Sequence, residues 1–166
     1  WKTLTSGAYC WYFLLNQNIN VVNYENCFGD LYNWFVVKDS RNVCPSGWHV
    51  PSDNEWTVLT NYIAANGYSG TEGKALKSIT GWRDDNGENG NGEDVFGFRF
   101  LPGGHRSPNG IYPGQGDDTF GYVWSSTKYS IDSSLNRRIG YHSDIVARDY
   151  DGDNNNVGAS IRCLRD

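Results

Sequence analysis

The alternation of apolar and polar residues is most regular around Trp56. Trp56, Leu59 and Ile63 recur at the spacing of one helix face, with polar residues between them. Ser52–Glu55 has the Ser-x-x-Glu form of a capping box, in which both side chains satisfy free amides at the start of a helix. Gly67 can end the helix, because glycine adopts the left-handed backbone at little cost. The pattern therefore predicts a helix between Ser52 and Gly67.

Shorter patterns lie on both sides of this helix. A second helical turn is expected from Lys74 to Ile79, closed by Gly81. Residues 1–37 combine aromatic clusters with polar breaks, which fits either strands or a short buried segment. Short apolar or alternating runs predict further strands at Phe96–Phe100, Tyr122–Ser126, Leu135–His142, Ile145–Tyr150 and Ala159–Leu164. Two helices followed by several short strands predict a single α+β domain over residues 1–166, loop-rich and with a twisted antiparallel sheet.

Composition adds an aromatic core and an acidic charge. The chain has 7 Trp, 11 Tyr and 7 Phe but no Met, and its 20 Gly indicate numerous turns. A formal net charge of −5 argues against a nucleic-acid partner, which would normally meet a basic face. No apolar run approaches the ~20 residues of a membrane span, so no direct membrane insertion is expected.

The cysteines favour an oxidising environment. They form an even set without the Cys-x-x-Cys spacing of zinc ribbons or thioredoxin-like redox motifs. Two disulfides in a secreted or cell-surface protein are the preferred interpretation, and four buried thiols in a cytosolic domain are the alternative. The four residues are Cys10, Cys27, Cys44 and Cys163.

The end of the chain differs in composition from the rest. From Tyr129 to Asp166 there is no Lys, Glu, Gln, Met or Trp, although all 7 Trp of the chain precede this segment. Tyr, Ser, Gly and Asn with some Arg are typical of binding loops, because they combine rigid aromatic area with adaptable hydrogen bonding. The composition predicts a recognition surface. A solvated sheet face without a ligand is the alternative, since such faces also carry alternating polar residues.

Five motifs, in the same order and spread over nearly the whole chain, resemble the Fibrobacter succinogenes major paralogous domain of secreted and surface-attached bacterial proteins. They are LYNW (31–34), CPSGWHVPSDNEW (44–56), FRFLPGGHR (98–106), WSST (124–127) and SIRCLRD (160–166). The resemblance implies a C-type-lectin-like fold of the formylglycine-generating-enzyme type. In that fold a disulfide clamps the two ends together, which implies the pairs Cys44–Cys163 and Cys10–Cys27.

The lectin-like branch also contains the variable proteins of diversity-generating retroelements, which mutate adenines, largely at AAY codons, in a C-terminal segment. Mutated AAY codons cannot produce Lys, Glu, Gln, Met or Trp, the residue types that are missing after Lys128. The resemblance therefore implies a variable region over residues 129–160. Ordinary family members also favour Asn, Ser and Tyr here, so a family member without diversification is the alternative. The family's W-x-R-x-L-x-Y pattern corresponds to Leu135–Tyr141, with leucine in the place of tryptophan.

Within this region, the resemblance assigns Arg137, Ile139 and Tyr141 to the fixed frame, and the alternate residues of the same strand should face outward. Aromatic side chains here could stack on sugar rings, anchor a protein epitope or belong to the core. The expected ligand-binding positions are Trp124, Tyr129, Asp132, Asn136, Arg138, Gly140, His142, Asp144, Ala147, Asp149, Tyr150 and Asp151.

No metal, cofactor or catalytic residue is expected. The acidic loop Asp84–Asp94 could hold calcium, but a flexible turn is the commoner outcome for such a loop. Asp149–Asn154 begins like an EF-hand loop, yet its glycine is misplaced and Ser160 stands where the bidentate glutamate belongs. The formylglycine-generating relatives use a late pair of copper-binding cysteines, whereas only Cys163 lies late here. The three histidines are isolated in the sequence and form no H-E-x-x-H motif.

The sequence therefore predicts a non-enzymatic, extracellular or cell-surface domain that binds a protein or glycan on another cell or host surface. Two other functions stay open: a structural cell-surface module without a specific ligand, and a carbohydrate-binding accessory domain of a secreted enzyme. A hydrolase would need two carboxylates at a defined separation in space, which sequence spacing does not supply.

Overall fold

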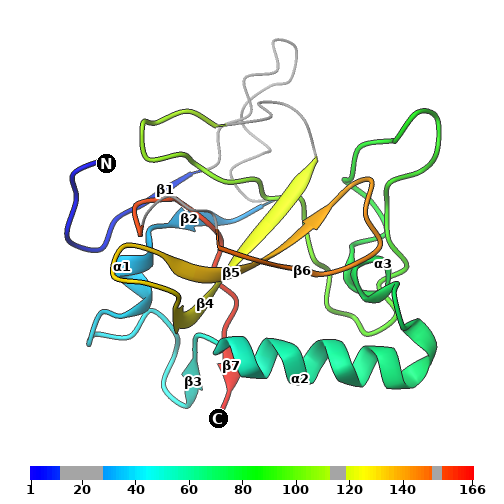
Figure 1. Ribbon diagram of the computed structural model, residues 1–166, viewed down its shortest axis with the longest axis horizontal. Coiled ribbons are helices and arrows are strands. Elements are labelled where there is room, and N and C mark those ends of the chain that lie inside the picture. Colours follow the sequence, from blue (N-terminus) through cyan, green and yellow to red (C-terminus); the bar gives the residue numbers. More distant parts are fainter. Residues whose placement is uncertain (12–27, 113–118, 151–154) are drawn as a thin grey trace.

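The computed structural model describes residues 1–11, 28–112, 119–150 and 155–166 and shows an α+β protein with short helices and small antiparallel sheets (Figure 1). Within these residues the α-helices are α1 (Trp34–Val37), α2 (Asp53–Ile63) and α3 (Glu72–Leu76), and α2 continues into a π-helical turn, η2 (Ala64–Tyr68). The strands are β1 (Tyr9–Trp11), β2 (Asp30–Tyr32), β3 (Trp48–His49), β4 (Phe120–Lys128), β5 (Ser134–Gly140), β6 (Ala147–Asp149) and β7 (Leu164–Arg165). The predicted α+β class is therefore confirmed.

Helix α2 begins where the capping box predicts it. The Glu55 amide donates a hydrogen bond to the Ser52 hydroxyl at 3.3 Å, and the Ser52 amide donates to the Glu55 carboxylate at 2.8 Å. Trp56 and Ile63 are buried on the inner face of the helix. The regular helix ends at Ile63, and Gly67 takes a φ of +98° in the π-helical turn that follows.

The central sheet has the order β4-β5-β6 and is antiparallel throughout. Its register places Tyr122 opposite Arg138 and Trp124 opposite Asn136. Because side chains alternate across a strand, these four residues share one face, and the residues between them point to the other. The sheet confirms three predicted strands, with their ends moved by a few residues.

Apolar side chains cover both faces of this sheet. There are two cores among the described residues, one on each face. The second lies on the face that carries Trp124, where residues 155–160 pack against β4. As a result, the middle of the sheet is covered on both sides. The first core lies between the sheet and the helices and contains Trp56, Ile63, Ala75, Leu76, Trp82, Phe100, Val123 and Ile139. The second core contains Trp34, Tyr122, Trp124, Val157 and Ala159.

The predicted strand at Phe96–Phe100 is wrong. Its three phenylalanine rings do contact the first core, and Phe100 is 3% exposed. However, Gly97 and Arg99 have φ angles of +66° and +54°, and left-handed residues cannot continue a strand. Phe100 instead pairs with Lys77 through an isolated bridge. Alternating rings therefore reach the core from an irregular segment.

Two other predicted elements are displaced. The helical turn predicted at Lys74–Ile79 is found as α3, which runs from Glu72 to Leu76. It ends there because Lys77 already has an extended ψ of 142°. The predicted last strand, Ala159–Leu164, is reduced to β7, since its first residues form isolated bridges to two separate segments. The end of the chain therefore passes from β2 and β4, which Ala159 and Ser160 contact, to β3, which pairs with β7.

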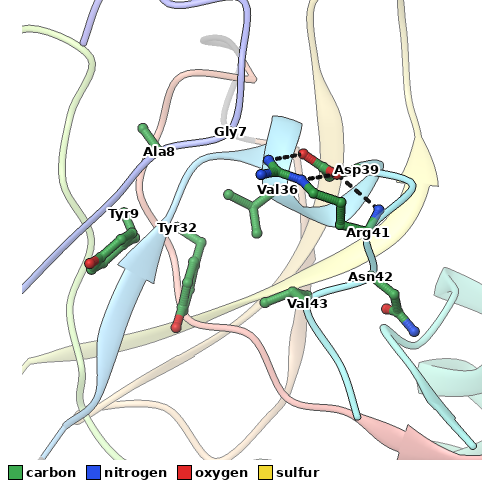
Figure 2. A pocket seen from close by; sticks show the side chains of 9 residues that line it. All are labelled: Gly7, Ala8, Tyr9, Tyr32, Val36, Asp39, Arg41, Asn42 and Val43. Carbon is green, nitrogen blue, oxygen red and sulfur yellow. Dashed lines mark hydrogen bonds and ion pairs between the residues drawn. The ribbon is translucent and has the colours of Figure 1, made fainter. Parts of the chain in front are cut away.

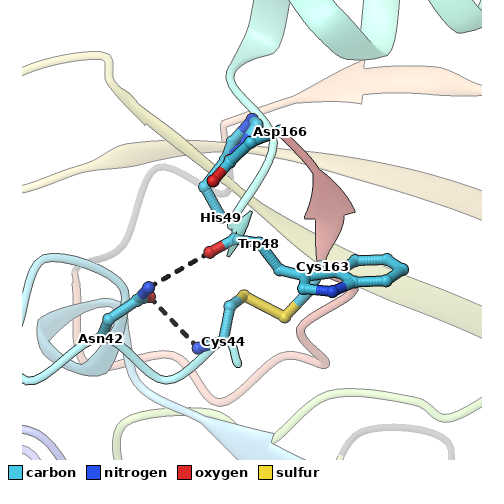
Figure 3. The surroundings of a disulfide bond; sticks show 6 residues. All are labelled: Asn42, Cys44, Trp48, His49, Cys163 and Asp166. Atoms are coloured by element: carbon cyan, nitrogen blue, oxygen red, sulfur yellow. Dashed lines mark hydrogen bonds and ion pairs between the residues drawn. A yellow bond between two sulfur atoms is a disulfide. The ribbon is translucent and has the colours of Figure 1, made fainter. Parts of the chain in front are cut away.

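A disulfide joins Cys44, ahead of β3, to Cys163, just before β7 (Figure 3). The two Cα atoms lie 5.8 Å apart across a sequence separation of 119 residues, and β3 pairs with β7 beside the bond. This pair is the one that the family resemblance implies. Cys10, in contrast, has no disulfide partner among the described residues. Its implied partner, Cys27, lies outside the described residues, so that pairing stays a prediction.

Candidate recognition surface

Two exposed tyrosines stack on each other at one end of the central sheet. Tyr129 directly follows β4 and Tyr150 directly follows β6. Both strands run antiparallel to β5, so their carboxyl ends meet at the same end of the sheet. The ring centroids are 4.2 Å apart with an interplanar angle of 14°, and the residues are 52% and 48% exposed. The structure therefore brings together two of the predicted ligand-binding positions.

Hydrogen bonds fix the turn that carries Tyr129. The amides of Tyr129 and Ser130 both donate to the Ser133 carbonyl at 3.0 Å, and the hydroxyls of the two serines are 2.7 Å apart. Asp132, a predicted ligand-binding residue, is exposed in this turn. Its carbonyl accepts a hydrogen bond from the Asn155 amide at 2.8 Å. The turn is thus held to the second core while its tip stays open to solvent.

An ion pair links two further predicted positions. Arg138 Nε lies 3.2 Å from Asp149 Oδ2, with side-chain exposures of 36% and 25%. The Arg138 guanidinium also lies 5.4 Å from the ring centroid of Phe120 and 6.0 Å from that of Tyr122. The rings of Phe120 and Tyr122 on β4 therefore lie next to the guanidinium of this ion pair. The pair remains accessible at the surface.

His142 and Asp144 lie at the opposite end of β5, in the turn that leads to β6, and both are exposed. The Asp144 carbonyl accepts hydrogen bonds from the amides of Gly73 at 2.7 Å and Lys74 at 3.1 Å. This turn consequently rests on α3. The length of β5 separates it from the stacked tyrosines by roughly 20 Å, at about 3.4 Å per strand residue.

A polar cavity of about 220 Å³ lies between this turn and the acidic loop Asp84–Asp94. Beside it, Lys77 is 1% exposed, its Nζ donates to the Tyr141 carbonyl at 3.2 Å, and burial lowers its pKa. The Asp94 carboxylate accepts a hydrogen bond from the Arg99 amide at 2.6 Å, so it stabilises the backbone that follows the loop. In the described part of the chain, no group of three or more His, Cys, Asp or Glu is placed to hold a metal ion.

Three predicted ligand-binding positions are buried. Trp124 and Asn136 are each 2% exposed, and neighbouring side chains close over Gly140. The Trp124 indole donates to the Tyr32 carbonyl at 2.7 Å, as a core residue does. The outward orientation predicted for Asn136 and Gly140 is wrong, because the sheet carries a second core on that face. Asp151 lies outside the described residues.

The other eight predicted positions are exposed or partly exposed, and we call them the recognition surface. Seven of them occupy turns and strand ends of the central sheet, and Arg138 lies within β5, between Tyr122 and Ala147. Their contact with a ligand stays a prediction. The eight residues are Tyr129, Asp132, Arg138, His142, Asp144, Ala147, Asp149 and Tyr150.

A buried arginine ties the sheet to the first turn of α2. Arg137 is 4% exposed, and its Nη2 lies 2.8 Å from Asp53 Oδ1. The same nitrogen donates to the Asp53 carbonyl at 2.9 Å and to the Thr57 hydroxyl at 3.1 Å. Arg148 on β6 binds the other Asp53 oxygen at 2.9 Å. Arg137 therefore has the frame position that the family resemblance implies.

His105 packs next to Tyr122 and close to Arg138, a placement that no pattern in the sequence indicated. Its ring centroid is 4.6 Å from that of Tyr122. Burial, with a smaller contribution from the Arg138 charge, lowers the pKa of His105 to about 4. The imidazole is therefore neutral at pH 7 and does not add to the positive charge of Arg138.

A cavity of about 430 Å³ lies between the β1–β2 pair and the segment after α1 (Figure 2). No pattern in the sequence predicted it. The rings of Tyr9 and Tyr32 form one wall with their centroids 6.0 Å apart, and Val36 also lines it. Across from them, Arg41 and Asp39 form an ion pair of 2.6 Å. Because these charges neutralise each other, the cavity offers mainly apolar and aromatic surface.

Comparison with known proteins identifies the family. The family model of the Fibrobacter succinogenes major domain matches residues 2–165, a range that includes both disulfide cysteines and all three strands of the central sheet. No curated protein and no solved structure matches the chain. Among the described residues, no helix has the length and apolar character needed to cross a membrane. The chain belongs to the Fibrobacter succinogenes major domain family.

Proposed function

We propose that the protein is a non-enzymatic ligand-binding domain displayed outside the cell, and that the recognition surface contacts its ligand. The observation that carries the proposal is the exposed stack of Tyr129 and Tyr150. Tyrosines combine a large apolar ring with a hydroxyl, which makes them frequent anchors in binding interfaces. Arg138 and Asp149 add a charged pair that can exchange partners with a ligand.

The spread of the surface favours a protein ligand over a single sugar. The turn with His142 and Asp144 lies one strand length, roughly 20 Å, from the tyrosine stack. A standard protein interface buries about 800 Å² on each partner and so spans both ends of the sheet. A monosaccharide would contact one end alone.

The proposal also includes a C-type-lectin-like fold and an extracellular location. The disulfide between Cys44 and Cys163, which joins the segment ahead of the long helix to the end of the chain, supports the fold. It also supports the location, because structural disulfides persist in oxidising compartments. The proposal finally includes diversification of residues 129–160. The residue types that are missing after Lys128 support it.

Binding can be tested on protein and glycan arrays with the wild-type domain and three variants. Tyr150→Ala and Arg138→Ala should each weaken capture of the ligand, with a loss of about tenfold or more for a central anchor. Tyr62→Ala is the matched control, because Tyr62 is 57% exposed on α2, away from the recognition surface. Unchanged capture by both Tyr150→Ala and Arg138→Ala would place the binding site elsewhere.

Diversification has a separate test at the level of DNA. Sequencing the encoding locus should reveal a near-identical template repeat that differs from the coding repeat at adenines, next to a reverse transcriptase. The differences should fall on codons of exposed positions such as Tyr129, His142 and Tyr150. A locus without a template repeat would refute diversification. It would not affect the binding proposal, which the arrays test separately.

A further inference from the structure

A third cavity lies apart from the recognition surface, between residues of α2 and β7. Strand β7 lies beside the start of α2 (Figure 1). The volume of the cavity is about 300 Å³, at the lower end of the range of ligand pockets. Cys163 of the disulfide forms part of its wall, so one side of the pocket is covalently linked to the segment ahead of α2. Its apolar lining consists of Pro51, Trp56, Leu59, Phe98 and Leu164.

Two charged residues, Glu55 and Arg162, also line this pocket, and they differ in whether a group that can carry the opposite charge touches them. Glu55 accepts hydrogen bonds from the Ser52 amide and hydroxyl, at 2.8 and 2.7 Å, and lies 2.9 Å from His49 Nε2. Arg162 stacks on Phe98, with 4.3 Å between its guanidinium carbon and the ring centroid. Among the described residues, no carboxylate oxygen lies within 4.0 Å of the Arg162 guanidinium.

Trp56, one of the lining residues, also carries a buried donor. Trp56 is 2% exposed, and its indole Nε1–H has no hydrogen-bond partner among the described residues. Buried donors are normally paired, so each exception needs an explanation. Partial burial, the larger effect, lowers the pKa of Arg162, while the charge of Asp94 opposes this shift. An apolar pocket beside a guanidinium without a carboxylate in contact is complementary to an apolar molecule that carries an anionic acceptor.

We propose that this pocket binds a small organic carboxylate with a single aromatic ring. The carboxylate pairs with the Arg162 guanidinium, which stays accessible because the residue is exposed as a whole. The ring packs against Trp56, Leu59 and Phe98 in the apolar part of the pocket. The site is independent of the recognition surface, because none of the eight residues of that surface lines it.

The proposal can be tested by fluorine NMR titration of the whole chain with two probes of the same shape. These are 4-fluorophenylacetate and its neutral amide, 4-fluorophenylacetamide. The wild type should bind the carboxylate at least about fivefold more tightly than the amide, since a charge-assisted pair is stronger than a neutral hydrogen bond. Arg162→Gln should remove this preference, whereas Arg165→Gln, an exposed neighbour on β7 outside the pocket, should keep it.

Three results would overturn the proposal. One is the absence of carboxylate binding by the wild type at millimolar concentration, and another is equal affinity for the carboxylate and the amide. The third is an unchanged preference in Arg162→Gln. Leu59→Trp, which fills the pocket, provides an independent check on the location, with circular dichroism to establish folding. Loss of binding in a folded Leu59→Trp variant supports the pocket, and retained binding refutes it.

Discussion

The Asp53 carboxylate holds two strands of the sheet against α2, and its removal gives a sharp prediction. Asp53→Asn keeps the size of the side chain but leaves Arg137, 4% exposed, without its counter-charge. Removing one partner of a buried ion pair costs about 3–5 kcal/mol, because the other charge stays desolvated. The Asp53 carbonyl and the Thr57 hydroxyl still accept hydrogen bonds from Arg137. The expected loss in unfolding free energy is therefore near the lower limit, about 3 kcal/mol.

The matched control is Arg148→Gln, which removes the exposed partner of the same carboxylate. The Arg148 side chain is 53% exposed, so its ion pair is screened by solvent and should contribute less than about 1 kcal/mol. Urea unfolding, followed by far-ultraviolet circular dichroism, gives both free energies by linear extrapolation. If Asp53→Asn costs no more than Arg148→Gln, the buried pair with Arg137 does not hold the sheet to the helix and the reasoning fails.

Three further predictions concern the cross-link, a buried histidine and a close backbone contact. Replacing Cys44 and Cys163 together by Ala should lower the unfolding free energy by about 5 kcal/mol, given the separation of 119 residues; a loss below about 1 kcal/mol in urea would contradict the entropic argument. His105 has a pKa of about 4 when folded and 6.5 as its ordinary value, so the unfolded chain binds the proton first and stability falls as the pH drops from 6.5 to 4. His105→Gln should reduce this fall by at most about 1.4 kcal/mol per pH unit, and equal pH slopes for variant and wild type would exclude the effect. Gly73→Ala would place a Cβ 2.6 Å from the Ile145 carbonyl oxygen and should cost about 1–3 kcal/mol, which thermal unfolding measures; an unchanged midpoint would show that the contact relaxes freely.

Local signals were sufficient for the elements that local forces determine. The capping box at Ser52 and the apolar spacing of Trp56 and Ile63 predicted α2, and the structure confirms both. The same logic failed at Phe96–Phe100, where alternation predicted a strand. Left-handed residues such as Arg99 allow the rings to face the core without a ladder, and apolar spacing carries no information about the sign of φ.

Burial on the second face of the sheet depends on contacts that are distant in sequence. Asn136 and Trp124 alternate in the manner of an outward face, yet residues 155–160 and α1 cover them. Likewise, the stack of Tyr129 on Tyr150 results from the parallel direction of β4 and β6, which the sequence did not specify. Composition therefore indicated a candidate region and its residue types, while the topology determined which of those residues reach the surface.

A sheet that is covered on both faces presents its turns and strand ends, and this limits where residues can vary. Tyr129 and His142 are exposed in turns at the two ends of β5, and Tyr150 is exposed directly after β6. Asn136 lies between β4 and β6 in a closed interior, so a change of its volume must be absorbed by core residues. Variation in this family member is therefore compatible with the fold at the exposed positions beyond the two ends of β5 and incompatible with it at Asn136.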